Sequence, residues 1–404
     1  MRKRFLIVGG SYAAAEAAAQ ARDSGYIDDI LIVSEELVPP YHRPPLSKAF
    51  MKSDSSNVDP LKGAAFYSSR NIELELGVSV VKVTEDNTAE LSNGKHIQFD
   101  SLMLAVGART RKLTCPGAEF SNVHYLKSVE DALALKAAAA GAQNVVVIGG
   151  GFIGLEVAST LAQQQKNVTV IEATDRVLAR VVSPEVSQFI EAAHIRHGVN
   201  LLCGNGVERI EGEHGKATQV ILSSGATLAA DLIVVGIGSI ANTDLAAQLG
   251  LEIENGIVVD GHSRTSKPNV YAAGDCAYHK SAFNPYGIRL ESVQNAQDQA
   301  RIAGANVAGV EKLYDALPWF WSDQYSYKLQ IAGLSVGATE RHAIGDDESL
   351  SVFHFKDEIC VCIESINRAR DHLAARRLLP QGVTKRQLQD FDFDVAALLK
   401  QLAS

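Results

Sequence analysis

The sequence predicts an α/β protein with two parallel sheets, followed by a C-terminal α+β domain. One observation is a unit that occurs twice in the chain: a strand, a glycine-rich turn, a helix and a second strand that ends in an acidic residue. Another is that residues 318–404 contain the strand-like runs SVFHF and EICVCIES and then a helical segment. A chain of 404 residues, 46% hydrophobic and 21% charged, is long enough for two or three domains with separate cores.

The first copy of this unit begins with FLIV at residues 5–8, a run typical of a buried parallel strand. The turn GGSYAA follows, then the helical run AEAAAQAR and the strand DILIVSEE, which we expect to end at Glu35. This is the order of a βαβ unit that binds a dinucleotide, with a phosphate at the helix N-terminus and the acid on a ribose hydroxyl. The fingerprint G-x-G-x-x-G becomes G-x-S-x-x-A here. The predicted contact residues of this turn are Gly9, Ser11, Tyr12, Ala13 and Ala14.

The second copy matches the fingerprint fully. A strand at residues 145–148 leads into GGGFIG, and the second strand ends at Glu172. Two such units imply two dinucleotides, one a tightly held flavin and the other a nicotinamide that comes and goes. Hydride transfer needs their rings face to face. The predicted contact residues of this turn are Gly149, Gly151, Phe152, Ile153 and Gly154.

Three further apolar strands end in small residues, at 101–110, 231–239 and 267–277. The third ends at Gly274-Asp275, and a carboxylate after such a turn can hydrogen-bond a ribityl chain. We therefore add Ala105, Gly274 and Asp275 to the flavin contacts and Gly238 to the nicotinamide contacts.

The stretches YHRPPLSK (41–48), RLESVQNAQDQA (289–300) and PWFWSDQY (318–325) carry a resemblance to a known family. With the two βαβ units, they resemble the FAD-dependent ferredoxin reductases that feed electrons from NADH to bacterial Rieske oxygenases and cytochromes P450. These enzymes have the glutathione-reductase fold, and the resemblance covers the whole chain. It implies that hydride passes from NADH to FAD. Single electrons then pass to a [2Fe–2S] ferredoxin, which serves a terminal oxygenase, as in aromatic hydrocarbon catabolism.

The resemblance also implies roles for charged residues. Arg43 and Lys48 contact FAD, with Lys48 close to the flavin ring. Glu156 contacts the nicotinamide end and can pair with Lys48 in the absence of NADH. We interpret Lys48 and Glu156, the predicted catalytic residues, as positioning and electrostatic groups, because hydride transfer requires no general base. Further flavin contacts implied by the resemblance are Ala13, Glu35, Val81, Lys127, Asp275, Val293 and Trp321.

The choice between NADH and NADPH depends on Glu172. A carboxylate that accepts from a free 2′-hydroxyl repels a 2′-phosphate, so Glu172 predicts NADH. Arg176 and Arg180 lie within reach along the chain and weaken this prediction. By resemblance, Arg180 contacts the NADH.

The five cysteines form no C-x-x-C pair, and their odd number argues against a disulfide framework or a cysteine-based metal site. We therefore predict a reducing compartment and no metal. Cys360 and Cys362 are expected to be half-buried strand thiols. The YHRPPLSK region holds no cysteine, so we expect electrons to leave the flavin directly, and an iron–sulfur partner must be a separate protein.

The net charge of −9 argues against a general nucleic-acid surface. The apolar run in MRKRFLIVGG is too short for a signal peptide, and no run approaches the ~18 apolar residues of a membrane span. We therefore expect a cytoplasmic protein, monomeric or homodimeric. Docking of an acidic ferredoxin needs a local basic face. The candidates for it are Arg301, Arg368, Arg376 and Arg377.

The predicted division has three domains. Residues 1–110 and 240–317 form the FAD-binding domain, residues 111–239 the NAD-binding domain and residues 318–404 the C-terminal domain. Three other functions remain open at this point: a rubredoxin reductase, an NADH oxidase, and a redox-signalling flavoprotein similar to apoptosis-inducing factor.

Overall fold

The computed structural model describes residues 3–63 and 65–402. The chain forms two compact units, each assembled from three segments that are far apart in the sequence. Unit 1 contains the chain up to His42, Val58–Arg109 and Ile240–Phe320. Unit 2 contains Arg43–Asn57, Thr110–Ser239 and the chain from Trp321. The division into three domains stays a prediction.

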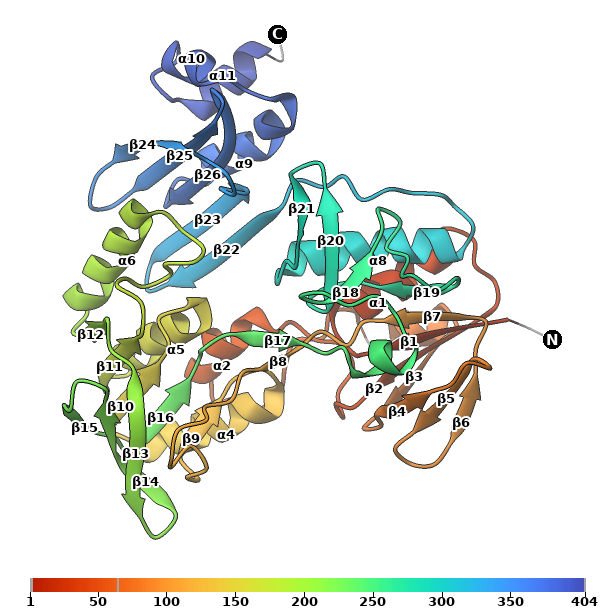
Figure 1. Cartoon of the computed structure of the whole chain (residues 1–404), viewed down its shortest axis with the longest axis horizontal. Coiled ribbons are helices and arrows are strands. Elements are labelled where there is room, and N and C mark those ends of the chain that lie inside the picture. The colour runs from red at the N-terminus through yellow and green to blue at the C-terminus, as the bar shows by residue number, and fades with distance from the viewer. Residues whose placement is uncertain (1–2, 64, 403–404) are drawn as a thin grey trace. The chain divides into compact units, whose positions relative to one another are not determined.

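Unit 1 is built on a parallel sheet of order β19-β7-β1-β2-β3 (Figure 1). The expected FLIV and DILIV strands are confirmed, and Glu35 follows directly after the second of them. Side chains alternate between the two faces of β1, so that Leu6 and Val8 enter one core and Phe5 and Ile7 the other. The strands are β1 (Arg4–Val8), β2 (Asp29–Ser34), β3 (Ile72–Leu76), β7 (Ser101–Leu104) and β19 (Val270–Ala272).

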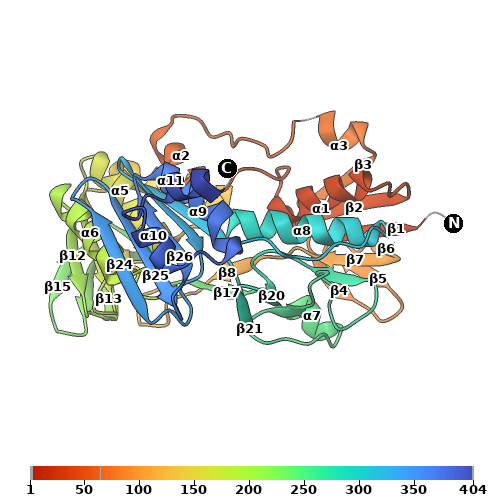
Figure 2. The same ribbon diagram turned by 90° about the horizontal axis from the view of Figure 1, so that it is seen from above.

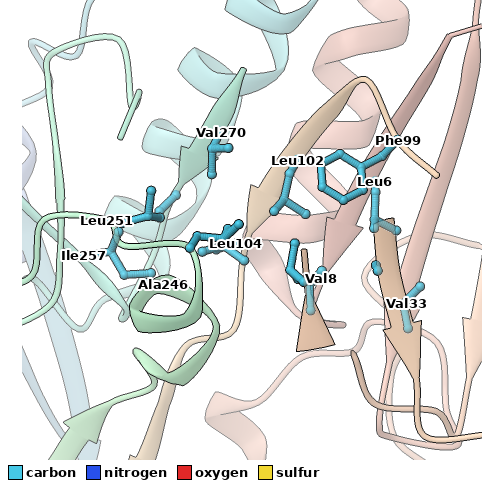
Figure 3. Packing of buried hydrophobic residues seen from close by; sticks show 14 of the residues in the cluster. Leu6, Val8, Val33, Phe99, Leu102, Leu104, Ala246, Leu251, Ile257 and Val270 are labelled. Carbon is cyan, nitrogen blue, oxygen red and sulfur yellow. The ribbon is translucent and has the colours of Figure 1, made fainter. Parts of the chain in front are cut away.

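One face of this sheet carries two helices, α1 (Tyr12–Asp23) and α8 (Val293–Val307), which run side by side (Figure 2). Their contact is close because a Cβ at Gly304 would lie 2.4 Å from the Ala17 carbonyl oxygen. The other face packs an apolar cluster, shown in Figure 3, against an antiparallel sheet. That sheet consists of β4 (Val80–Val83), β5 (Thr88–Leu91) and β6 (His96–Gln98).

Several of the remaining elements of unit 1 add side chains to these two cores. A third sheet has the order β18-β20-β21. The chain passes between the units at β8 and β17, where the unit boundaries fall. These elements are α3 (Ala65–Ser69), β8 (Ala108–Thr110), β17 (Ser239–Ala241), α7 (Asp244–Gln248), β18 (Ile257–Val259), β20 (Ala277–Ser281) and β21 (Asn284–Ile288).

Unit 2 contains a second parallel sheet, of order β12-β11-β10-β16-β9 (Figure 1). Both strands and the helix of the second βαβ copy are present, with the second strand ending at Glu172 as expected. An antiparallel sheet of β13 (Val207–Glu213), β14 (Lys216–Leu222) and β15 (Thr227–Ala229) adjoins it in the chain. The strands and helices of the parallel layer are β9 (Val123–Tyr125), α4 (Val129–Gly141), β10 (Asn144–Ile148), α5 (Phe152–Gln163), β11 (Asn167–Glu172), α6 (Pro184–Arg196), β12 (Asn200–Cys203) and β16 (Leu232–Val235).

The C-terminal part of unit 2 is a five-stranded sheet of order β22-β23-β26-β25-β24 followed by helices, as the sequence predicted. Cys360 and Cys362 lie on its central strand, but each is only 1% exposed, so the expectation of half-buried thiols was wrong. The central strand is covered by neighbours on both edges. The elements are β22 (Trp319–Gln324), β23 (Tyr327–Gly333), β24 (Glu340–Gly345), β25 (Leu350–Lys356), β26 (Ile359–Ile366), α9 (Ala369–Leu378), η2 (Leu379–Gln381), α10 (Lys385–Gln389) and α11 (Val395–Leu402).

The basic stretch YHRPPLSK is not an irregular loop throughout. It contains a 3₁₀ helix, η1 (Pro44–Ser47), which leads into the short helix α2 (Ala49–Lys52). Prolines are tolerated in the first turn of a helix, because the N–H groups that they lack would have no partner there. In the part of the chain that is described, no helix has both the length and the apolar character needed to cross a bilayer.

Candidate active site

The first glycine turn lies at the carboxyl ends of β1 and β7. Gly9 has φ of +119°, and a Cβ on it would lie 2.1 Å from the Ala105 carbonyl oxygen, so only glycine fits. Ser11 is the N-cap of α1 but makes no side-chain cap hydrogen bond. The first N–H groups of α1 therefore have no capping side chain, as an anion-binding helix start requires.

Two predicted flavin residues, Ala13 and Gly274, meet at the start of α1. The Cβ position of Gly274 lies 3.6 Å from Ala13 Cβ and 3.4 Å from Ala296 Cβ. The Gly274 N–H donates to Gln299 Oε1 over 3.0 Å, and Arg289 Nη1 donates to the Asp275 carbonyl oxygen over 3.0 Å. The stretch 289–300 thus fixes the Gly274-Asp275 turn, and α8 begins at the predicted contact residue Val293.

Two further predicted flavin contacts of unit 1 lie on different elements, Glu35 directly after β2 and Val81 on β4. Glu35 is exposed, and Val81 is 46% exposed. Leu37, which the sequence analysis did not select, is 73% exposed beside Gly77. Exposed apolar side chains of this kind can pack against the face of a purine base.

The second turn repeats the geometry of the first. Gly149 has φ of +109°, and its Cβ would lie 2.4 Å from the Gly236 carbonyl oxygen. A Cβ on Gly154 would lie 2.2 Å from the Gly149 carbonyl oxygen. Gly151 is the N-cap of α5, and Ile153 in the first turn is 48% exposed. All residues of this turn thus leave room for a ligand backbone at the helix start.

Glu172 organises the end of β11. Its Oε2 accepts from the Gly150 N–H over 2.7 Å, and its Oε1 accepts from the N–H and hydroxyl of Thr174 over 2.8 and 2.7 Å. Arg176 points back into its own loop, where it donates to the carbonyl oxygens of Ala179 and Val182 over 2.9 and 3.1 Å.

Arg180 lies at the tip of this loop and is exposed. Its Nη2 is 3.7 Å from the Cβ position of Gly238, which has φ of +102°. Two residues predicted to contact the nicotinamide nucleotide are therefore neighbours in space.

A buried carboxylate forms the centre of the site in unit 2. Glu156, on α5, is 5% exposed and accepts three hydrogen bonds or ion-pair contacts. Lys48 Nζ lies 2.6 Å from Oε2, which also accepts from the Ser47 hydroxyl over 2.6 Å. The Ser322 hydroxyl donates to Oε1 over 2.7 Å. The expected pair of Lys48 and Glu156 is thus present.

The 3₁₀ helix is fixed in place by neighbours on both sides. Thr160 on α5 donates to the Ser47 carbonyl oxygen over 2.9 Å. Arg43 Nη1 donates to the Lys127 carbonyl oxygen over 3.0 Å, so two predicted flavin contacts meet here. Trp321, next to Ser322 on β22, is half-buried.

Comparison with known proteins identifies the family. Residues 3–300 match the family described as pyridine nucleotide-disulphide oxidoreductase, and residues 319–402 match the family described as reductase C-terminal. The chain belongs to the pyridine nucleotide-disulphide oxidoreductases. The fold is accordingly of the glutathione-reductase type.

The similarity to individual proteins extends over the whole chain. Rhodocoxin reductase from Rhodococcus erythropolis is 42% identical over 97% of this chain and 93% of its own. The solved ferredoxin reductase for the CYP199A2 system from Rhodopseudomonas palustris has a TM-score of 0.95 at 39% identity, covering 100% of both chains. The structure of a covalent putidaredoxin reductase–putidaredoxin complex has a TM-score of 0.94 at 34% identity, covering 100% of this chain and 99% of the other.

Members of this oxidoreductase family use FAD and NAD(P)H, and so does this chain. The residues present fit these groups. In both turns a Cβ on the first glycine would collide with a backbone oxygen, so both keep the close backbone geometry of a phosphate-binding turn. Which residue contacts which nucleotide remains a prediction, with the flavin assigned to the turn of unit 1.

The arginines predicted to dock a partner differ in their surroundings. Arg301 pairs with Glu16 at 3.1 Å and with Asp298 at 2.9 Å, so two carboxylates offset its charge. Arg368 pairs with Asp371 at 2.6 Å. Arg376 and Arg377 are exposed on the last turn of α9.

Four residues that fix the site were not selected from the sequence: Ser47, Arg289, Gln299 and Ser322. All of them belong to the three stretches that carried the family resemblance. A polar residue adjacent to a predicted contact in such a stretch was the available signal.

Proposed function

We propose that this oxidoreductase is an NADH:ferredoxin reductase. It takes hydride from NADH and delivers single electrons to a small [2Fe–2S] ferredoxin, which serves a terminal oxygenase. When bound, FAD supplies the conversion between two-electron and one-electron chemistry. The protein's own residues bind and orient the two nucleotides and set the charge around them.

The observation that carries this proposal concerns the thiols. The family is named for disulphide chemistry, and a thiol relay needs a low-pKa cysteine. Burial instead raises the pKa of Cys115 and Cys203, and raises that of Cys276 to about 11 and that of Cys360 to about 12. The pKa of Cys362 is also well above its usual value. Electrons must therefore leave the flavin without a protein thiolate. All five thiols are free, which supports a reducing cytoplasm as the location.

NADH is the proposed donor because of two neighbouring side chains. Glu172 presents a carboxylate at the end of β11, where it repels a 2′-phosphate. Arg176, the nearer cation along the chain, is occupied by the carbonyl oxygens of its own loop. It is therefore poorly placed to neutralise that phosphate.

Lys48 and Glu156 are proposed to act as an exchangeable pair. In the free protein their charges compensate each other at 2.6 Å in a buried setting. Nucleotide entering beside Glu156 would release Lys48 toward the flavin side. A cation at that point stabilises negative charge that develops there.

The proposed ferredoxin surface is the exposed face of α9. Arg370, Leu373 and Arg377 recur at helical spacing, and Leu373 is 59% exposed between the arginines. A central apolar anchor surrounded by cations fits an acidic protein partner.

The first test is anaerobic reduction of the flavin by NADH, followed by cytochrome c reduction with and without an added [2Fe–2S] ferredoxin. Fast flavin reduction with strongly ferredoxin-dependent cytochrome c reduction is expected. Electron transfer to oxygen at the same rate as to ferredoxin would establish an NADH oxidase instead. A rubredoxin that outcompetes ferredoxin would make the protein a rubredoxin reductase.

The docking surface is tested separately with Arg377→Glu. We expect the KM for ferredoxin to rise about tenfold (~1.4 kcal/mol) and NADH-to-ferricyanide turnover to stay unchanged. Arg209→Glu is the control, a charge reversal of a partly exposed arginine on the antiparallel sheet of unit 2 that pairs with Glu208 and Glu211. An unchanged KM in Arg377→Glu would remove α9 from the proposed surface.

A further inference from the structure

Glu364 is a fully buried carboxylate on the central strand of the C-terminal sheet, with 0% exposure. A charge or a polar group in such a place is costly unless hydrogen bonds satisfy it. Its partners lie outside its own sheet, at the start of α6. Oε1 and Oε2 lie 3.0 and 3.1 Å from the backbone nitrogen of Ser183, and the Ser183 hydroxyl donates to Oε2.

A second group in the sheet lies beside the same carboxylate. His354, on the neighbouring strand β25, is 4% exposed, and its Nε2 lies 3.3 Å from Glu364 Oε2. The strand register places His354 opposite Cys362, so His354 and Glu364 are diagonal neighbours on one face. Among the described residues His354 Nε2 makes no hydrogen bond, so the ring contributes only its proximity, and the hydrogen bonds that fix the carboxylate are those from Ser183.

Ser183 closes one end of the loop between β11 and α6. Its Oγ accepts from the Val186 N–H over 3.3 Å, which makes Ser183 the N-cap of α6. The same hydroxyl donates to Glu364, so helix start and sheet are joined through one side chain. The loop that ends here is the segment 173–182.

The interior of this loop is also fixed. Arg176 bonds the carbonyl oxygens of Ala179 and Val182, and the Leu178 N–H donates to the Gly150 carbonyl oxygen over 3.0 Å. Leu178 has φ of +55°, a conformation that a branched side chain adopts only when its surroundings impose it. A loop held in this way transmits the position of its end to its tip, where Arg180 lies.

We propose that Glu364 is a positioning residue for nicotinamide nucleotide binding. It holds Ser183, and through it the loop 173–182, in the conformation that presents Arg180 next to Gly238. The proposal rests on the proposed function in one respect, namely that Arg180 contacts the nucleotide. The C-terminal sheet thereby takes part in the affinity for the electron donor, while helix α9 of the same region carries the proposed acceptor surface.

The test compares Glu364→Met, which removes the acceptor oxygens at similar length, with Glu364→Gln, which keeps one. NAD⁺ is titrated into each FAD-loaded variant, and NADH-to-ferricyanide kinetics are recorded. We expect the Kd for NAD⁺ and the KM for NADH to rise about tenfold in Glu364→Met (~1.4 kcal/mol) and less in Glu364→Gln. The kcat at saturating NADH should stay within about twofold, because the reacting groups are untouched.

Glu340→Gln is the matched control. Glu340 is a carboxylate of the same sheet that is exposed and paired with Lys385, and it makes no contact with Ser183 among the described hydrogen bonds and ion pairs. Its Kd and KM should equal those of the unchanged protein. Should Glu364→Met fail to fold, the Kd for NAD⁺ of Glu364→Gln, compared with that of Glu340→Gln, still tests the positioning role.

A double-mutant cycle with Arg180→Ala separates positioning from general stability. If Glu364 acts through Arg180, Glu364→Gln adds nothing to the weakened NAD⁺ binding of Arg180→Ala. Additive effects of the two changes on the Kd for NAD⁺ would overturn the positioning role. An unchanged Kd in a folded Glu364 variant would overturn it as well, provided that Arg180→Ala weakens binding. An unchanged Kd in Arg180→Ala would instead refute the nucleotide contact assumed in the proposed function.

Discussion

The two glycine turns have the same backbone but different surroundings. Gly9 and Gly149 both have positive φ, and the missing Cβ of each would lie within 2.4 Å of a carbonyl oxygen directly after a neighbouring strand, that of Ala105 after β7 and that of Gly236 after β16. The position of the third fingerprint glycine differs, however. In unit 1 it is Ala14, whose methyl group is buried. In unit 2 it is Gly154, where a methyl group would collide with the Gly149 carbonyl oxygen. The helix of unit 2 therefore packs closer to its turn than the helix of unit 1.

The acids at the ends of the second strands differ as well. Glu172 is bonded to the Gly150 N–H, whereas Glu35 is exposed and the space beside Gly10 is filled by Ser34, whose Oγ lies 2.2 Å from a Cβ placed there. The turn of unit 2 is thus braced by its own acid. A permanently held ligand can supply such bracing in unit 1, whereas an exchanging ligand requires a turn that is ordered without it.

The largest expected effect comes from alanine at the first glycine of each turn. Gly9→Ala should be purified without flavin, whereas Gly149→Ala should keep its flavin and lose NADH-dependent turnover. Positive φ and a contact with backbone oxygen together leave no room for the methyl group. Flavin absorbance and NADH kinetics check this. The reverse pattern would exchange the assignment of the two turns.

A smaller effect is expected at the third position. Gly154→Ala forces α5 away from the turn, and we expect the KM for NADH to rise about thirtyfold (~2 kcal/mol). Ala14→Gly removes only a methyl group and costs about 1 kcal/mol of helix stability. It should lower the Tm by a few degrees with the flavin retained. Equal effects of the two changes on their ligands would show that the helices pack alike.

The acids give the third comparison. Glu172→Gln should shift the ratio of kcat/KM between NADH and NADPH toward NADPH by about tenfold (~1.4 kcal/mol), because the repulsion of the 2′-phosphate is lost. Glu35→Gln should leave that ratio unchanged and affect only flavin retention. A shift in the ratio caused by Glu35→Gln would contradict the division of roles.

The smallest expected effect is a pH dependence of stability in both units. Burial lowers the pKa of His194 in unit 2 and of His279 in unit 1 to about 4. The unfolded chain then binds more protons, so their stabilising contribution is complete above pH 6.5 and is lost as the pH falls toward 4. Each histidine should cost about 1 kcal/mol between pH 7 and 5.5.

Denaturant midpoints at pH 7 and 5.5 measure this loss, and His194→Gln and His279→Gln should each reduce it. The neighbours of His194 can be satisfied by a neutral ring, which has one donor and one acceptor nitrogen. Its Nε2 lies 2.8 Å from Gln324 Oε1, and its Nδ1 lies 3.2 Å from the Tyr325 hydroxyl. A pH dependence unchanged in both variants would mean that neither ring is buried in the neutral form.

The strands and turns were predictable because local patterns determine them. Apolar runs and glycines that require positive φ are visible in the sequence itself. The surroundings of Glu156 were not predictable in this way. Ser47 and Ser322 are separated from it by 109 and 166 residues, and only tertiary packing decides that their hydroxyls reach it. The 3₁₀ helix at Pro44 was missed for another reason: adjacent prolines predict stiffness without specifying a helical turn.

The sheet of unit 1 has one edge strand from far down the chain. β19, at Val270–Ala272, pairs with β7, whereas every strand of the parallel sheet in unit 2 lies between residues 123 and 235. On the ribosome, where domains fold as they emerge, the parallel sheet of unit 2 is therefore complete before that of unit 1, although unit 2 itself also contains the last segment of the chain. The edge of β7 stays unpaired until β19 has been synthesised. Gly274, a predicted flavin contact two residues after β19, is synthesised equally late, so the predicted flavin site is completed only after the parallel sheet of unit 2.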